Sequence, residues 1–311
     1  MRLDIAARSD IGRRKREQED SFGVFRDDTP GLTLFRHGAL LAVADGLGGH
    51  MGGEIASKLA ISLLKDVLKE QPPAVPVENL DGALLDLLTR YIQTANISVF
   101  KTNQDINPQG KPMGTTLAAC LISQKKVHIC NVGDSRVYHL RDGEIISRTE
   151  DHSWVDEQVK LGLMSKSEAE ADVRKNVVTR SVGTRPDVVV DSYVWHIVPG
   201  DWILVCSDGL VNMVKDADIC LEFKKSGSAA EIAARLVNLA NENGGKDNIT
   251  VITSAISPSP FRLIYFKLRA IKRRHGYKLL WFLVSAVLGL AGFVAGYLYH
   301  SRGGTISLLN P

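Results

Sequence analysis

Cysteine is scarce in this 311-residue chain, and the spacing of the few that occur excludes several kinds of site. Cys120, Cys130, Cys206 and Cys220 form no Cys-x-x-Cys pair and have no zinc-finger spacing. Three of them lie in apolar, strand-like runs, and none lies beside a glycine-rich loop suited to binding an anion. We therefore expect reduced, buried thiols rather than disulfides, zinc ligands or a catalytic nucleophile.

Acidic residues are missing from the C-terminal part of the chain. No Asp or Glu follows residue 257, whereas eight of the 38 Lys and Arg residues do, so residues 1–257 have a net charge of −5 although the whole chain has +3. Such segregation indicates two different environments. No aromatic platform or known binding module accompanies the basic residues, so we expect no nucleic-acid partner.

Charge of either sign is absent from Leu279 to Tyr299, a run of 21 residues. As a helix this run would be roughly 30 Å long, which matches the hydrocarbon core of a bilayer, so we predict a transmembrane helix over 279–299. The basic residues before it (Lys272, Arg273, Arg274, Lys278) outnumber the one after it (Arg302). This asymmetry predicts a single-pass protein of the inner (cell) membrane with its N-terminal domain in the cytoplasm.

The sequence thus divides into a folded domain (1–257), a basic juxtamembrane segment (258–278), the predicted helix, and a short extracytoplasmic tail (300–311). The juxtamembrane segment is either an interfacial helix in contact with membrane lipid or a plain stop-transfer flank. Gly292 and Gly296 form a GxxxG pair, which would allow a homodimer through the helix, although glycine is common in such helices in any case. The first residues lack an apolar h-region, so we expect no signal peptide.

Short β-branched runs bounded by Gly, Asp or Pro follow one another in the domain, and helical patterns occur in separate blocks over 54–70, 80–101 and 229–241. This order predicts an α+β fold with antiparallel sheets covered by helices rather than a parallel sheet. Residues 152–176 are typical of two short polar helices inserted between strands, which form either a mobile flap or surface decoration.

Several acids follow or precede apolar strands, at positions where Asp is also simply a good turn residue. They are Glu19 and Asp20, then Asp45 in VADGLGGHMGGE, Asp134, Asp208 and Asp247. Carboxylate oxygens with few His or Cys suit Mg²⁺ or Mn²⁺. Two such ions lower the pKa of a bound water and make it a nucleophile for phosphorus. The glycines after Asp45 would let backbone carbonyls approach a metal.

Six motifs, in this order, resemble the bacterial form of the type-2C metal-dependent protein phosphatases, the PPM family. They are REQEDSFG, VADGLGGHMGGE, MGTTLAA, NVGDSR, CSDGL and KDNITVI, and the resemblance covers about residues 9–256. It implies a four-layer α-β-β-α sandwich of two antiparallel sheets flanked by helices. It also implies hydrolysis of phosphoserine and phosphothreonine in proteins without a phosphoenzyme, at two Mn²⁺ or Mg²⁺ ions.

The resemblance also implies residue roles. Asp45 matches the bridging ligand and Gly46 the backbone carbonyl ligand, while Asp208 and Asp247 match ligands of the first ion. Glu19 matches a ligand of the second ion. Further matches are Asp20 as holder of the water network, Asp134 as a ligand of a third, weaker ion, and Asn248 as the residue that orients the loop around Asp247. Asp45, Asp208 and Asp247 are the expected catalytic residues. Thr115, Thr116 and Arg136 are expected to be structural.

Two positions depart from the family pattern. The family usually has an Arg five residues before Asp20 that grips the substrate phosphate, and here this residue is Lys15. Lys supplies charge but no bidentate fork, so Arg14 or Arg16 is an alternative phosphate ligand. Leu47 stands where animal members have a His that is proposed as a general acid, and we assign no proton transfer to His50.

These features predict a membrane-anchored bacterial Ser/Thr protein phosphatase that acts on the substrates of a Ser/Thr kinase. A catalytically weak pseudophosphatase that binds phosphoproteins as a membrane scaffold is the alternative, and the Lys15 departure is the feature that favours it.

Overall fold

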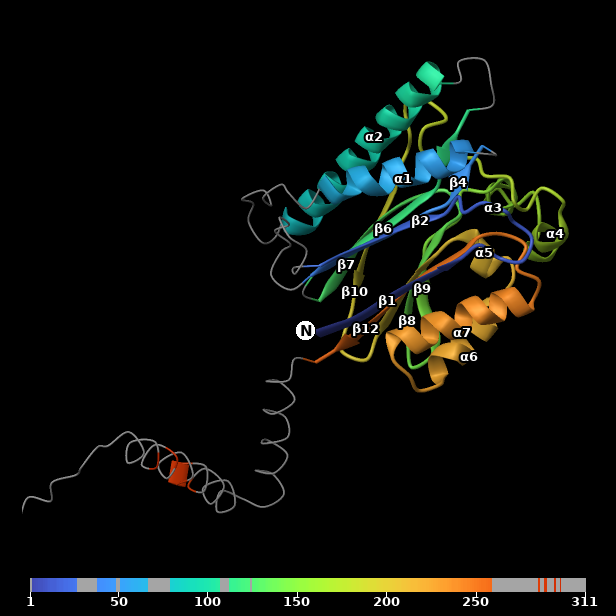
Figure 1. Ribbon diagram of the computed structural model, residues 1–311. Helices are drawn as coiled ribbons and strands as arrows, with labels where there is room; N and C mark the ends of the chain where they lie inside the picture. The colour runs from blue at the N-terminus through green and yellow to red at the C-terminus, as the bar shows by residue number, and fades with distance from the viewer. Residues whose placement is uncertain are drawn as a thin grey trace, which may run out of the picture. The chain divides into compact units, whose positions relative to one another are not determined.

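A computed structural model describes residues 2–26, 38–48, 51–66, 79–106, 112–123 and 125–258, together with residues 285, 288, 289, 294 and 297 (Figure 1). The chain divides into two compact units, Met1–Ser257 and Pro258–Pro311. The elements below all belong to the first unit.

Within the described residues, ten strands form two five-stranded antiparallel sheets. The first sheet has the order β1 (Arg2–Asp10), β12 (Ile249–Ser257), β11 (Trp202–Cys206), β8 (Arg136–Arg141), β9 (Glu144–Arg148). The second has the order β10 (Asp191–His196), β7 (Lys126–Val132), β6 (Leu117–Ser123), β3 (Ala39–Ala44), β2 (Ser21–Arg26). A short third pair joins β4 (Gly46–Leu47) to β5 (Gly114–Thr115). The prediction of antiparallel sheets is confirmed.

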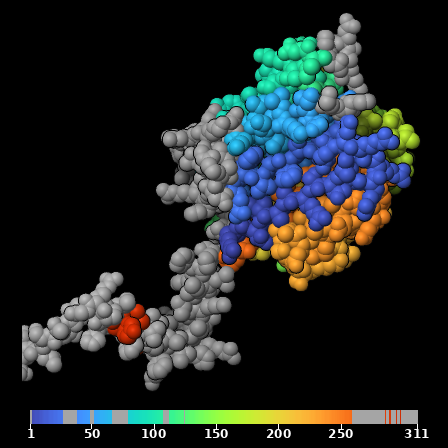
Figure 2. Space-filling view, viewed as in Figure 1, coloured from blue at the N-terminus to red at the C-terminus, as the bar shows by residue number. Residues whose placement is uncertain are grey.

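Helices cover the outer face of each sheet, as Figure 1 shows. The second sheet packs against α1 (Met51–Asp66) and α2 (Leu80–Ile106), and the first against α5 (Asp208–Val211), α6 (Asp216–Lys224) and α7 (Ala229–Glu242). The predicted four-layer sandwich is therefore confirmed. The edge strands β1 and β2 lie on the face seen in Figure 2, where the N-terminal residues are at the surface between α1 and α7.

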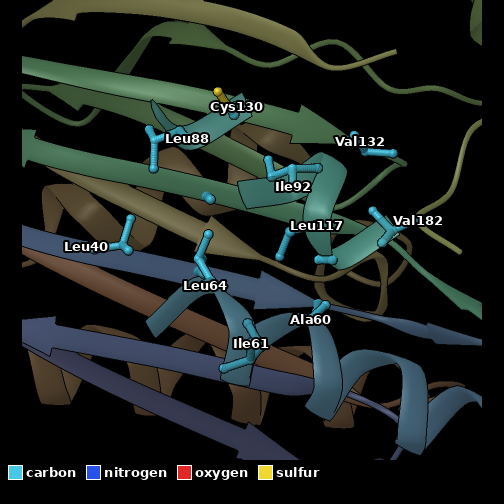
Figure 3. Close-up of a cluster of buried hydrophobic side chains, with 14 of the residues drawn as sticks. Leu40, Ala60, Ile61, Leu64, Leu88, Ile92, Leu117, Cys130, Val132 and Val182 are labelled. Carbon is cyan, nitrogen blue, oxygen red and sulfur yellow. The ribbon is translucent and has the colours of Figure 1, made fainter. Parts of the chain in front are cut away.

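Three buried hydrophobic clusters lie between the layers, and strand β3 contributes residues to two of them. Leu40, Ala42 and Ala44 pack in one buried cluster with Leu64 of α1 and Ile92 of α2. Figure 3 shows Leu40, Leu64 and Ile92 in this cluster. Leu41 and Val43 face the other sheet, because successive side chains of a strand point to opposite sides. All six residues of β3 are buried, which explains the uninterrupted apolar run that precedes Asp45.

Two predicted helix boundaries are wrong. Helix α1 begins at Met51 rather than Glu54, because Gly53 in its first turn allows close packing against Gly46. Helix α2 continues past Lys101 to Ile106. The amide Nδ2 of Asn103 donates to the carbonyls of Met113 (2.7 Å) and Gly183 (2.8 Å), so tertiary hydrogen bonds hold a polar last turn that lacks an apolar pattern.

The cysteine prediction agrees with the structure. Cys120, Cys130 and Cys206 are buried, Cys220 is half-buried, and all four are unbonded. Burial raises the pKa of the Cys120 and Cys206 thiols, which keeps them protonated and unreactive.

The part of the chain that the structure describes contains no helix long and apolar enough to cross a membrane. The predicted membrane helix over 279–299 lies outside the described residues, apart from five single helical positions. Gly292, Gly296 and His50 also lie outside them. The membrane span and the homodimer through it stay predictions.

A buried ion cluster fixes the turn between β10 and β11. Asp201 is fully buried, and its carboxylate accepts hydrogen bonds from Arg141 Nε (2.7 Å), from His139 Nε2 (2.8 Å) and from the backbone N–H of Val198 (2.8 Å). Burial alone would raise the pKa of Asp201, but these hydrogen bonds, that of Arg141 above all, lower it below the usual value. The ionised form of Asp201 is therefore stabilised by folding.

Replacement Asp201→Asn should lower the free energy of unfolding at pH 7 by about 2–3 kcal/mol, because it removes a charge that three donors share. Since the folded pKa of Asp201 is depressed, its contribution is present above the unfolded value of about 3.9 and is lost as the pH falls. The difference in free energy of unfolding between the parent and Asp201→Asn, measured with urea, should therefore narrow below about pH 4. The exposed Glu144, mutated to Gln, is the control in neighbouring β9, and equal losses in both variants would contradict the assignment.

Candidate active site

Asp45 directly follows buried strand β3, and hydrogen bonds hold both its backbone N–H and its carbonyl. Its backbone N–H donates to Thr116 Oγ1 (2.9 Å), and its carbonyl accepts from Thr116 N–H (2.8 Å) and Thr115 Oγ1 (2.9 Å). The two threonines are thus structural, as expected, and they also hold this acid in place. These hydrogen bonds fix the backbone from which the carboxylate projects.

Glycines allow three segments to meet beside Asp45. A Cβ on Gly46 would lie 2.3 Å from the carbonyl oxygen of Gly53, and a Cβ on Gly53 would lie 2.7 Å from Glu19 Oε1. Any side chain at either position would therefore collide with backbone or with an acid of the site. The close approach brings helix α1, the residue after Asp45 and Glu19 to one point.

The acids predicted from separate motifs converge, as their mutual effects on ionisation demonstrate. Burial raises the pKa of Asp45 well above its usual value, and the charges of Asp20, Asp208 and Asp134 raise it further. Burial raises the pKa of Asp20 to about 7, with contributions from Asp208 and Asp247. Burial also raises the pKa of Asp208, and the charge of Asp247 raises it further.

The same effect reaches Asp134. Burial raises the pKa of Asp134 well above its usual value, and the nearby charges of Asp208 and Asp151 add to it. Arg136 binds Asp151 rather than any predicted metal ligand, with Nη2 2.6 Å from Asp151 Oδ2. Arg136 is therefore a structural support, as expected.

Asn248 ties the N-terminal turn to the site. Its Oδ1 accepts from the N–H of Glu19 (2.7 Å), and its Nδ2 donates to the carbonyls of Ile11 (3.0 Å) and Glu17 (3.0 Å). Its own N–H donates to Asp247 Oδ1 (2.8 Å). The sequence assigned Asn248 to the Asp247 loop, and the structure adds that its side chain holds the turn over residues 11–19.

The structure identifies two positioning residues that the sequence analysis did not. Ser207 Oγ donates to Asp20 Oδ2 (2.8 Å), and His152 Nδ1 accepts from the N–H of Gly133 (3.1 Å), next to Asp134. His152 Nε2 lies 3.1 Å from Asp191 Oδ2, and burial lowers the pKa of His152, so the ring is neutral with its proton on Nε2. Ser207 directly precedes Asp208 in the sequence, a signal that could have been used, whereas nothing in the sequence links His152 to Gly133.

The inserted residues 152–176 form two helices, as predicted. These are α3 (Trp154–Lys160) and α4 (Lys166–Ala171). Helix α3 is anchored where Thr179 Oγ1 donates to Glu157 Oε1 (2.7 Å), and the Arg174 guanidinium lies 3.5 Å from the Trp154 ring centroid. The segment starts at His152, so it is joined to the loop that carries Asp134.

Of the three basic residues predicted to bind phosphate, Lys15 contacts the acids. Its Nζ lies 2.6 Å from Asp247 Oδ1 and 3.4 Å from Glu19 Oε2. Arg14 and Arg16 are exposed, and neither has an ion pair with a described residue.

The donor set fits divalent cations. Glu19 Oε1, Asp20 Oδ1 and Asp208 Oδ1 are buried and accept no hydrogen bond. Buried carboxylate oxygens without a donor are costly, and a hard cation would satisfy them. As the described side chains lie, no three His, Cys, Asp or Glu residues already form a group that could hold a metal ion. Lys15 instead bridges two of the acids.

Gly53→Ala should weaken Mn²⁺ binding at least about tenfold, because the added methyl group displaces Glu19 and the peptide of Gly46. Titration calorimetry measures the effect. Gly82→Ala is a matched control in helix α2, since a Cβ there meets nothing within 4 Å. Unchanged Mn²⁺ affinity in Gly53→Ala would show that this close packing does not shape the site.

Comparison with known proteins agrees with this geometry. The family model described as protein phosphatase 2C matches residues 18–250. The serine/threonine phosphatase stp of Listeria innocua is 38% identical over 250 residues, which cover 79% of this chain and 92% of that protein.

Solved structures extend the likeness to the fold. The serine/threonine phosphatase of S. agalactiae superposes with a TM-score of 0.73 at 32% identity, covering 82% of this chain and all of that one. The catalytic domain of PstP, solved in complex with two manganese ions, has a TM-score of 0.65 at 32% identity, covering 82% and 99% of the two chains. With the family model spanning most of the chain and these relatives covering four fifths of it, the protein belongs to the protein phosphatase 2C family.

Proposed function

We propose that this protein hydrolyses phosphoserine and phosphothreonine in proteins, at a site that holds two Mn²⁺ or Mg²⁺ ions. The observation that carries the proposal is the set of converging carboxylates, several of them with buried oxygens that lack a donor. The names of the relatives support it, since they are serine/threonine phosphatases, as does the pair of manganese ions in the PstP structure.

The residues that would hold the ions are Asp45, with the carbonyl of Gly46 and the side chains of Glu19, Asp208 and Asp247. When bound, the ions supply Lewis acidity and a hydroxide nucleophile at neutral pH. Asp20, held by Ser207, orients water in the site. Asp134 is the proposed ligand of a third, weaker ion. Asp45, Asp208 and Asp247 carry catalysis through these contacts.

The substrate phosphate is proposed to bind at the turn that carries Arg14, Lys15 and Arg16. Lys15 reaches the acids directly, and the two arginines beside it are exposed cations without an ion pair among the described residues. A phosphate in front of so many carboxylates needs positive charge nearby. A non-catalytic scaffold has no use for the complete acid set, so we favour the enzyme over the pseudophosphatase.

Asp45→Asn and Asp208→Asn should each lower the rate of p-nitrophenyl phosphate and phosphothreonine-peptide hydrolysis at least about 100-fold, because each removes a charge that binds the ions directly. Residues 1–257, purified and dialysed free of metal, should turn over only after Mn²⁺ or Mg²⁺ is added. Asp105→Asn removes an exposed carboxylate at the end of α2 and should keep full activity. Robust turnover in EDTA, or peptide binding without hydrolysis in the parent protein, would contradict the proposal.

We further propose that residues 279–299 anchor the enzyme in the cell membrane with the phosphatase domain in the cytoplasm, where it opposes a Ser/Thr kinase. The support is the uncharged 21-residue run and the excess of basic residues before it.

The full chain should remain with membranes after washes with high salt and with carbonate, whereas residues 1–257 should be recovered in the soluble fraction. A chain with Leu283, Leu288 and Val294 replaced by Arg is the control, since charge at the centre of the run opposes insertion. Release of the parent chain by high salt alone would indicate an electrostatic surface contact instead of a span. Cross-linking in membranes that yields monomers alone would remove the proposed homodimer through the helix.

A further inference from the structure

Lys15 is the one residue of its basic turn whose side chain points at the acids rather than at solvent. Its ammonium group lies 2.6 Å from Asp247 Oδ1 and 3.4 Å from Glu19 Oε2, and its side chain is 37% exposed. The two acids lie near opposite ends of the sequence of the domain, and both belong to the proposed ligand set. One lysine therefore neutralises two carboxylates that divalent cations would otherwise bind.

The chemistry of lysine suits this position. An ammonium group is a compact point charge with three donors, so it can bridge two carboxylates that do not share a plane, which the planar fork of an arginine does less well. The turn is held rigidly enough to keep this contact, because Asn248 binds the carbonyls of Ile11 and Glu17 and the N–H of Glu19. The N–H of Arg13 also donates to the carbonyl of Gly245 (2.7 Å).

The two contacts of Lys15 limit what else it can bind. Two of its three ammonium donors are directed at Asp247 and Glu19, which leaves one donor for a substrate phosphate. Divalent cations bound by Asp247 and by Glu19 would repel the ammonium group that lies against these two carboxylates. The freed side chain would then lie at the rim of the site with its charge unpaired.

We propose that Lys15 is an internal counter-ion that competes with divalent cations for Glu19 and Asp247, and that cation loading releases it to bind the substrate phosphate. This inference rests on the proposed function. It makes binding ordered, with the cations first and phosphate second. It also gives the departure from the family arginine a consequence, namely weaker cation binding than the acids alone would provide.

Arg14 provides a matched control. It stands one residue away on the same turn, carries the same charge, is exposed, and has no ion pair with a described residue. Lys15→Met and Arg14→Met therefore remove equal charge from nearly the same place. Any difference between them reports the contact with Asp247 and Glu19 rather than the general field of the turn.

Titration calorimetry of residues 1–257 with Mn²⁺ tests the competition. Lys15→Met should bind Mn²⁺ about tenfold or more tightly than the parent, about 1.4 kcal/mol, and Arg14→Met should differ from the parent by much less. Lys15→Gln should behave like Lys15→Met, which guards against an effect of the apolar side chain. Equal Mn²⁺ affinity in the parent and in Lys15→Met would overturn the inference. Absence of Mn²⁺ binding in every variant would instead overturn the proposed function.

Inorganic phosphate tests the release. In thermal-shift titrations, phosphate should stabilise the parent in the presence of saturating Mn²⁺ and have little effect without it. Lys15→Met should lose most of the phosphate effect even with saturating Mn²⁺. Equal stabilisation of the parent by phosphate with and without Mn²⁺, or full stabilisation of Lys15→Met, would contradict a lysine that must first be released.

Discussion

Carboxylate groups repel one another, and this domain holds several of them together in one small volume. Burial, and after it the charges of neighbouring acids, raise the pKa values of Asp20, Asp45 and Asp134, so folding disfavours their ionised forms. The cost is offset elsewhere, because each acid is attached to backbone that the core of the sandwich has already fixed. The anchors of the acids and the position of the site at the strand ends both reflect this opposition between a rigid scaffold and mutually repelling charges.

The anchors that resist the repulsion are mostly neutral. Thr116 holds the peptide of Asp45, Asn248 holds the turn before Glu19, Ser207 holds Asp20, and His152 holds the loop that precedes Asp134. Neutral donors fix geometry without cancelling the negative potential that attracts cations. Lys15 is the exception, since its charge acts directly on two of the acids, and this is why its position bears on cation affinity.

The acids of the site lie at the ends of strands from both sheets of the sandwich. Asp45 follows β3 of one sheet, whereas Asp208 follows β11 and Asp247 precedes β12 of the other. The acids therefore meet where the two sheets end side by side, and the packing between the sheets sets the distances between them. Asn248, which directly precedes β12, holds the N-terminal turn against the same site.

The sequence by itself determined the family and the α+β sandwich, and it predicted the acids that the structure brings near one another and the structural roles of Thr115, Thr116 and Arg136. It could do so because the six motifs that carry the family resemblance, the turn residues and the acids beside apolar strands are all local features. It did not place the boundaries of α1 and α2, which depend on Gly53 against Gly46 and on the hydrogen bonds of Asn103. Only the tertiary structure decided that Lys15 rather than Arg14 or Arg16 contacts the acids, and that His152 and Ser207 support them. These choices depend on which side chains face one another across 19 to 232 residues of chain, and no local pattern encodes that.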